Sequence, residues 1–314
     1  MTIAGPAAHP AIGGLPLVLG GNVFGWTADR EASFAILDAF REAGGRMIDT
    51  AEAYSAWVPG HKGGESETVL GEWFADRGCR SDMLVATKTN VLGEAGGLAP
   101  GKVTAHLDGS LRRLQTDYVD LFYAHRDDPE TPQEDVAGGF DALIRAGKVR
   151  EAGASNFRSE RLAGALTAAD AVGAARYGVL QNRYNLVARK EYEGPLQELC
   201  VAEGVALLPY YGLASGYLTG KYRTKEDLGQ SPRGTTLTGL LEQGAPVLAV
   251  MDRIAAETGA SHAAIALAWI NAQPGVAAPI ASVSRVEQLD QLIEGARLKL
   301  DDAHLAALTA AGAG

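Results

Sequence analysis

Short apolar runs separated by helical patterns constrain the fold of this chain more than any other feature of its sequence. The runs are continuously apolar rather than alternating between apolar and polar residues, which is typical of parallel strands covered on both faces. They comprise residues 15–19, 47–48, 83–86, 119–123, 179–180 and 205–208. The sequence therefore predicts a buried parallel sheet whose strands recur along most of the chain.

Amphipathic helix patterns lie between these runs. Between the third and fourth runs, four apolar residues recur every three or four positions, as expected for a helix with one buried face. They are Val103, Leu107, Leu111 and Leu114. Farther along, Ser159 is predicted to cap a helix that carries Leu162 and Leu166. A strand followed by a helix, repeated with short turns, predicts a parallel α/β fold.

Two architectures accommodate such a sheet: an open doubly wound sheet and a closed (β/α)8 TIM barrel. The chain has 314 residues, 46% hydrophobic and 21% charged, and no break divides it, so we interpret residues 1–314 as a single domain. A TIM barrel takes about 250 residues, and more with insertions, so the length favours the barrel. The excess is predicted to form a long loop over residues 222–244 and an extra C-terminal helix capped near Asp301, with Leu305 and Leu308 facing inward.

Charge and cysteine content argue against several classes of function. A formal net charge of −10 disfavours binding to nucleic acid or an anionic membrane, which both require clustered Lys and Arg. No apolar run approaches the ~20 residues of a membrane-spanning helix, and the N-terminal residues lack the pattern of a signal peptide. Cys79 and Cys200 are expected to be buried thiols, which favours a cytoplasmic location. No metal-binding spacing of His or Cys is present, so no metal site is expected.

Four polar residues stand where predicted strands end. Asp49 closes the segment GGRMIDT, and Tyr54 follows it. Lys88 closes MLVATK, and His125 closes VDLFYAH. Each residue alone has an ordinary explanation, such as turn capping for Asp49 or core packing for His125. Because catalytic groups of TIM barrels lie at the C-terminal ends of the strands, the four side chains are expected to meet at one face.

The four residue types suit the reduction of a carbonyl group, which requires a hydride at carbon and a proton at oxygen. A free Tyr, with a pKa of about 10, is a reluctant proton donor at neutral pH. Lys88 is expected to lower the pKa of Tyr54, and Asp49 to keep the Lys88 ammonium charged and in place. His125 is expected to donate a hydrogen bond that orients the carbonyl and stabilises its developing negative charge.

The order and spacing of six segments resemble those of the aldo-keto reductase family. The segments are IDTAEAY, ATKTN, LFYAHRDD, GKVREAGASNF, LQNRYNL and LPYYGLASGYLTGKY. The resemblance runs from about Leu15 to Leu292, nearly the whole chain. It implies that the four polar residues form the catalytic tetrad of the family, with Tyr54 as general acid in reduction and general base in oxidation.

A nicotinamide cofactor is implied by this resemblance rather than by a local motif. No G-x-G-x-x-G fingerprint follows a predicted strand, so the residues do not support a Rossmann domain. Members of the family bind the cofactor extended across the mouth of the barrel. Ser155, Asn156 and Gln181 match residues that hydrogen-bond its carboxamide, and Tyr210 matches the aromatic on which the nicotinamide stacks. Turn formation at residues 155–156 and core packing of Tyr210 are the alternative explanations.

The resemblance also implies which residues hold the rest of the cofactor. Those for the pyrophosphate are Leu213, Ser215 and Lys221, with Arg233 in the long loop; those for the 2'-phosphate and adenine are Ser282, Arg285 and Gln288. A guanidinium beside a helix N-terminus suits a phosphate, so NADP(H) is favoured over NAD(H), although Arg285 is also explained as a solvated surface charge. The chain departs from the family at Ser284, in place of a common basic residue, and at Leu292, where Asn is frequent.

The substrate is expected to be a small carbonyl compound or alcohol, with Trp26 and Trp57 as candidate pocket walls, although lone aromatics are more often packed in a core. Its identity and the oligomeric state stay open, because specificity depends on loop shape. Two rival functions remain. One is a slow-turnover, cofactor-sensing binding protein resembling potassium-channel beta subunits. The other is a barrel aldolase in which Lys88 forms a Schiff base.

Overall fold

The computed structural model describes residues 12, 14–89, 97–230 and 237–312. Within these ranges, eight parallel strands form one sheet in the order β7-β6-β5-β4-β3-β2-β1-β8. They are β1 (Val18–Gly20), β2 (Met47–Asp49), β3 (Leu84–Thr89), β4 (Val119–Ala124), β5 (Val149–Ser155), β6 (Val179–Gln181), β7 (Ala206–Leu207) and β8 (Ile280–Ala281). Each strand from β1 to β6 lies beside the next one in the chain, and β1 also pairs with β8.

Backbone hydrogen bonds between β7 and the segment that enters β8 close the sheet into a barrel. Leu207 N donates to Gly275 O over 2.8 Å, and Ala277 N donates to Leu207 O over 2.9 Å. One step farther along, Ile280 N donates to Pro209 O over 2.8 Å. The predicted (β/α)8 TIM barrel is therefore confirmed, and the alternative of an open doubly wound sheet, whose strand order reverses at a switch point, is excluded.

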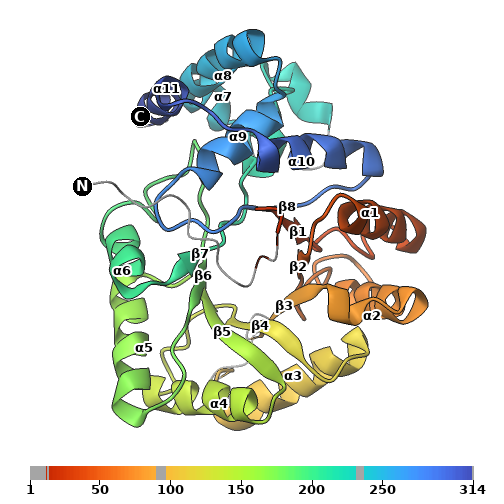
Figure 1. Ribbon diagram of the computed structural model, residues 1–314, viewed down its shortest axis with the longest axis vertical. Coiled ribbons are helices and arrows are strands. Elements are labelled where there is room, and N and C mark those ends of the chain that lie inside the picture. The colour runs from red at the N-terminus through yellow and green to blue at the C-terminus, as the bar shows by residue number, and fades with distance from the viewer. Residues whose placement is uncertain (1–11, 13, 90–96, 231–236, 313–314) are drawn as a thin grey trace.

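Helices follow the strands and surround the barrel (Figure 1). They are α1 (Arg30–Glu42), α2 (Glu65–Arg77), α3 (Pro100–Leu114), α4 (Gln133–Arg145), α5 (Ser159–Val172), α6 (Pro195–Glu203), α9 (His262–Asn271) and α10 (Leu289–Arg297). Beyond the barrel pattern the chain adds α7 (Leu240–Gln243), α8 (Ala245–Thr258) and α11 (Asp302–Ala311). Short 3-10 segments are η2 (Arg80–Asp82), η3 (Ala214–Thr219), η4 (Glu226–Gln230) and η6 (Val286–Gln288). Figure 1 shows α8 and α11 together at one end of the molecule, beside α9.

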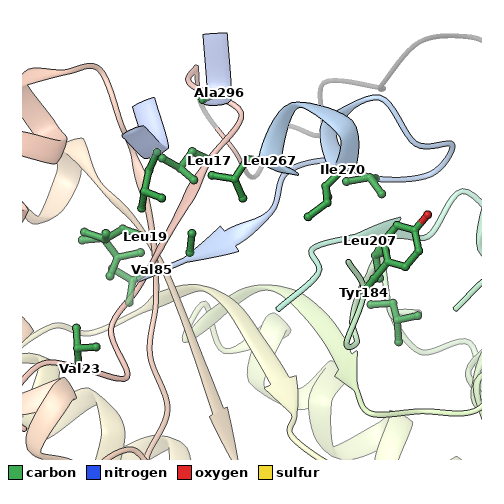
Figure 2. Close-up of a cluster of buried hydrophobic side chains, with 14 of the residues drawn as sticks. Leu17, Leu19, Val23, Val85, Tyr184, Leu207, Leu267, Ile270 and Ala296 are labelled. Carbon is green, nitrogen blue, oxygen red and sulfur yellow. The ribbon is translucent and has the colours of Figure 1, made fainter. Parts of the chain in front are cut away.

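Apolar side chains form two buried layers, one inside the barrel and one between strands and helices. Val18 belongs to the inner cluster, whereas its neighbour Leu19 belongs to the outer one, as the alternation of side chains along a strand requires. Figure 2 shows part of the outer cluster, in which Leu19 and Leu207 of the barrel lie with Leu267 and Ile270 of α9. Burial on both faces explains why the strands are continuously apolar.

The observed strands match the six predicted apolar runs but differ at their ends. Residues 15–17 precede β1, which begins at Val18, and β3 continues past the apolar residues to Thr89. Strands β5 and β8 were not among the predicted runs. Strand β5 reads VREAGAS, so small and charged residues replace the large apolar ones that mark the other strands. Cys79 and Cys200 are buried and unbridged, as expected.

The predicted helix cap at Ser159 is wrong. Arg158 occupies the capping position, Ser159 is the first residue of α5, and its hydroxyl donates to Pro195 O over 3.2 Å. The side chain therefore ties the start of α5 to the start of α6 instead of satisfying an amide of its own helix.

The C-terminal helix is confirmed, but the rest of the additional length is arranged differently from the prediction. Asp301 accepts a hydrogen bond from His304 N over 2.8 Å, Leu308 is fully buried and Leu305 packs partly buried against the core. The region 222–244 contains η4 and α7 rather than loop alone, and α8 adds a helix that was not anticipated.

Gly71, where α2 crosses the end of α3, gives a test of this packing. A Cβ added there would lie 2.1 Å from Arg113 O and 2.8 Å from the carbonyl carbon of Leu114. Because backbone cannot yield as a flexible side chain does, Gly71→Ala is expected to lower the free energy of unfolding by about 1–3 kcal/mol. The matched control is Gly138→Ala in α4, whose added Cβ meets nothing within 4 Å and should stabilise by about 0.5–1 kcal/mol. Urea denaturation measures both, and equal stability of the two variants would contradict the crossing.

Candidate active site

A cavity of about 960 Å³ opens at the C-terminal ends of the strands. It extends from the loops after β1 and β2, past the ends of β4, β5 and β6, to the turn before α10. Most of the predicted site residues line it: Trp26, Asp49, Tyr54, Trp57, His125, Ser155, Asn156, Gln181, Tyr210, Leu213, Ser215, Lys221, Ser282 and Gln288. Such a volume suits a cofactor together with a small substrate.

Lys88 lies beneath this cavity, fully buried, and its ammonium has three acceptors. Lys88 Nζ donates to Asp49 Oδ2 over 2.6 Å, to Thr50 O over 2.7 Å and to Tyr54 Oη over 2.8 Å. Tyr54 Oη in turn donates to Asp49 Oδ2 over 3.0 Å. An ammonium has three protons to donate, so the site satisfies the charged form of Lys88 completely. This arrangement disfavours a Schiff-base role, which needs a neutral amine.

The expectation that Lys88 lowers the pKa of Tyr54 is not met in this structure. Burial, followed by the nearby Asp49 carboxylate, raises the pKa of Tyr54 well above its ordinary value of 10.0. Burial also lowers the pKa of Lys88, and Asp49 acts in the opposite direction. Tyr54 therefore keeps its proton at neutral pH, and Lys88 lies within reach to stabilise the tyrosinate once that proton has left.

His125 follows β4 and faces Tyr54, with 6.3 Å between the ring centroids. Burial, with smaller effects of Lys88 and Arg126, holds the pKa of His125 well below its ordinary 6.5. The imidazole is therefore neutral at pH 7. A neutral imidazole carries one N–H, which is sufficient to donate a hydrogen bond to an oxygen held between His125 and Tyr54.

The depressed pKa of His125 predicts a pH dependence of stability. As the pH falls through 6.5, the usual pKa of the imidazole, the unfolded chain takes up a proton at His125 that the folded chain resists. The unfolded state then binds more protons, so the free energy of unfolding falls on acidification from about pH 7 to about pH 5. In His125→Gln this decrease should be shallower, as measured by urea denaturation at each pH. Parallel curves for the two proteins would show that His125 titrates normally in the folded chain.

Ser155, Asn156, Gln181 and Tyr210 form one hydrogen-bonded group beside the tetrad. Asn156 Nδ2 donates to Ser155 Oγ and to His125 O, each over 3.0 Å, and Tyr210 Oη donates to Asn156 Oδ1 over 2.7 Å. Gln181 Nε2 donates to Asp49 Oδ1 over 2.8 Å. Two of the residues expected to bind a carboxamide, Asn156 and Gln181, are therefore hydrogen-bonded directly to His125 and Asp49 of the tetrad.

Backbone in the left-handed region marks the turn after β7, where the pyrophosphate is expected. Ala214, Ser215 and Gly216 have φ values of 48°, 56° and 92°. Successive turn residues of this kind can direct backbone N–H groups into an anion-binding concavity. Ser215, Gly216 and Lys221 all line the cavity, so the sequence prediction for this part is consistent with the geometry.

Only some of the residues predicted to bind the 2'-phosphate and the adenine line the cavity. Ser282 Oγ donates to Asn22 Oδ1 over 2.5 Å, and Ser284 N donates to Gln288 Oε1 over 3.0 Å. Ser284, Gln288 and Leu292 line the cavity, whereas Arg285 is exposed and is not among the lining residues. Arg233 lies outside the described residues.

Among the residues of the cavity wall that sequence reasoning missed are Asn22, Arg126 and Tyr211. Asn22 follows the end of β1, and Arg126 directly follows His125, so the rule that located the tetrad at strand ends applies to both. Tyr211 has no comparable signal. Its φ of 59° is unusual for a residue with a side chain, and only the structure reveals it.

The described residues contain neither a membrane-spanning helix nor a cluster of metal-binding side chains. None of the helices in the described ranges combines the length and the apolar character that a membrane crossing requires. The His, Cys, Asp and Glu side chains that the structure describes do not gather anywhere into a group of three or more that could hold a metal ion.

Comparison with known proteins agrees with the fold. The model of the aldo/keto reductase family matches residues 16–313. The chain is 32% identical to the uncharacterized oxidoreductase YrpG of Bacillus subtilis, over 91% of this chain and 88% of the relative. It is 30% identical to an aryl-alcohol dehydrogenase [NADP(+)] of Phanerodontia chrysosporium (87% and 74%), and 31% identical to a probable voltage-gated potassium channel subunit beta of Oryza sativa subsp. japonica (85% and 82%). The chain therefore belongs to the aldo/keto reductase family.

Proposed function

We propose that this protein is an NADP(H)-dependent oxidoreductase that interconverts an aldehyde or ketone and the corresponding alcohol, with Tyr54 as proton donor. One observation carries the proposal. Tyr54 lines the cavity, and the buried Lys88 donates from Nζ to the Tyr54 hydroxyl over 2.8 Å. His125 completes the cluster on the same wall.

The cavity fits a nicotinamide dinucleotide. The hydroxyl and amide side chains of Ser155, Asn156 and Gln181 line the cavity beside the tetrad. Lys221 and the left-handed turn at residues 214–216, which come later in the chain, also contribute to its wall. Gln181 uses its N–H on Asp49, which leaves its carbonyl oxygen free to accept from a carboxamide N–H. When bound, the nicotinamide supplies the hydride for reduction or accepts it in oxidation.

Residues of this chain supply the proton that the carbonyl oxygen receives. In the described structure Tyr54 donates its hydrogen bond to Asp49, so the hydroxyl must turn toward a carbonyl oxygen in the cavity to donate there. As the proton leaves Tyr54 for that oxygen, Lys88 continues to donate to Tyr54 Oη and stabilises the tyrosinate. In oxidation the same tyrosinate takes the proton from the alcohol.

The preference for NADP(H) over NAD(H) rests on the turn before α10. Ser282 and Ser284 line the cavity there, and the exposed Arg285 follows Ser284 in the chain. A guanidinium at this position can swing toward a 2'-phosphate. The similarity to an aryl-alcohol dehydrogenase [NADP(+)] supports the same preference.

Titration of the purified protein with NADPH and with NADH, followed by quenching of tryptophan fluorescence, tests the cofactor. NADPH is expected to bind more tightly than NADH. Arg285→Ala is expected to weaken the binding of NADPH but not that of NADH. Lys299→Ala, which removes another exposed cation away from the cavity, is the control and should change neither. Failure of both nucleotides to bind would overturn the proposed function.

A second candidate function has one observation in its favour, the similarity to a protein named as a potassium channel beta subunit. A binding protein of this kind would hold the cofactor tightly and turn over slowly. Turnover of NADPH with a panel of aldehydes and ketones separates the two. Several turnovers per second on any member of the panel would favour the reductase, whereas tight NADPH binding with turnover slower than one per minute across the panel would favour the binding protein.

A further inference from the structure

Aromatic side chains surround the mouth of the cavity on the side of Tyr54. The rings of Trp26 and Trp57 meet edge to face with centroids 5.5 Å apart, and those of Tyr54 and Trp57 with centroids 6.2 Å apart. Trp57 and Tyr211 are 51% and 52% exposed. Large aromatic surface left open at a cavity mouth favours a ligand with a flat apolar face.

Tyr211 is held at this mouth by strained backbone. Its φ of 59° lies in the left-handed region, which disfavours a residue with a large side chain. The carbonyl of Tyr211 accepts from Asn185 Nδ2 over 2.8 Å, and its ring packs against Tyr210 with centroids 5.2 Å apart. Strain of this kind persists where the surrounding structure fixes it and is concentrated at functional sites.

Arg126 supplies a positive charge on the same cavity wall. It directly follows His125 and is exposed. Within the described part of the chain, no ion pair or hydrogen bond engages its guanidinium. Asp49 is the sole carboxylate among the described lining residues, and it is already bonded to Lys88. The other lining cation, Lys221, lies on the turn expected to hold phosphate.

We propose that Arg126, together with the aromatic mouth formed by Trp26, Trp57 and Tyr211, selects aromatic carbonyl substrates that carry a negatively charged group. The inference rests on the proposed function and names the substrate class of that same site. A chain with a net charge of −10 repels anions in general, so an anionic substrate needs a local guanidinium. Arg suits a carboxylate because its planar fork can donate two parallel hydrogen bonds.

Four aldehydes separate the two elements of the proposal: 4-carboxybenzaldehyde and its neutral methyl ester, methyl 4-formylbenzoate, and the aliphatic pair succinic semialdehyde and butanal. The expected order of kcat/KM places 4-carboxybenzaldehyde first, about tenfold above the methyl ester. The aliphatic anion should fall below the aromatic anion by about fivefold.

Arg126→Gln should abolish the preference for the carboxylate by raising KM for 4-carboxybenzaldehyde about tenfold more than KM for the methyl ester. Arg183→Gln is the matched control. Burial raises the pKa of the Tyr210 phenol and each of these arginines lowers it, so both arginines lie near that ring. Of the two, only Arg126 lines the cavity. Trp57→Ala should reduce the preference for the aromatic over the aliphatic anion.

Equal kcat/KM for the acid and its ester, or an unchanged preference in Arg126→Gln, would overturn the inference and leave the reductase intact. Weaker NADPH binding in Arg126→Gln with the preference unchanged would assign Arg126 to the cofactor instead. If neither these aldehydes nor any aldehyde or ketone of the wider panel is reduced, the proposed function fails. Binding of 4-(hydroxymethyl)benzoate, followed by tryptophan fluorescence, then decides the inference alone: it holds if Arg126→Gln weakens binding about tenfold and fails if binding is unchanged or absent.

Discussion

Replacing Tyr54 with Phe is expected to lower kcat for carbonyl reduction by about 10²–10⁴-fold, the usual contribution of a positioned general acid. The substitution removes the hydroxyl that receives the hydrogen bond from Lys88 over 2.8 Å and leaves the ring on the cavity wall. The affinity for NADPH should change little, because the removed hydroxyl contacts Lys88 and Asp49. Steady-state kinetics with a neutral aldehyde, together with NADPH titration, measure both effects.

Tyr177→Phe is the matched control for this variant. Tyr177 is buried, its hydroxyl has no hydrogen-bond partner among the described residues, and it lies outside the cavity. Loss of that hydroxyl should leave kcat unchanged. A Tyr54→Phe protein that keeps the full rate would show that the proton comes from elsewhere, and His125 would then be the next residue to replace.

The positions of the tetrad could be predicted because they depend on the topology of the sheet. In a parallel barrel all strands run the same way, so Asp49, Lys88 and His125, each at the end of an apolar run, must share one face. The hydrogen bond between Gln181 and Asp49 joins residues 132 positions apart, and nothing in the sequence specifies it. The effect of burial on the pKa of Tyr54 was also beyond reach, since it depends on the packing around the hydroxyl.

Weak strand patterns and side-chain directions mark the limits of sequence reasoning for this chain. Strand β5 carries Arg150 and Glu151 in its first half, so its residues lack the continuous apolar character of β4. Arg285 stands at the expected helix N-terminus, but its exposed side chain does not line the cavity. Sequence spacing fixes the position of a residue on a helix start, whereas the direction of a long flexible side chain depends on its solvation and on the ligand.

Lys88→Met is expected to lower the free energy of unfolding by about 3–5 kcal/mol, the cost of leaving one partner of a buried ion pair without the other. Lys88 and Asp49 are both buried, and 2.6 Å separates Nζ from Oδ2. In the variant, Asp49 keeps hydrogen bonds from Tyr54 and Gln181 but no positive charge. Urea denaturation gives the stability. Carbonyl reduction should fall at least as far as in Tyr54→Phe, because the tyrosinate loses its stabilising ammonium.

The double variant Lys88→Met/Asp49→Asn distinguishes loss of charge pairing from loss of packing. Asparagine can still accept the hydrogen bond from Gln181 and carries no charge, so the buried carboxylate that makes Lys88→Met unstable is gone. The double variant should therefore be more stable than Lys88→Met alone, and the double-mutant cycle should give an interaction free energy of about 0.5–3 kcal/mol between the two positions. Activity should stay lost in both, since neither has an ammonium beside Tyr54. If instead the effects of Lys88→Met and Asp49→Asn on stability are additive, the pair does not interact in solution, and the charged contact at 2.6 Å cannot be what holds Tyr54 ready to donate its proton.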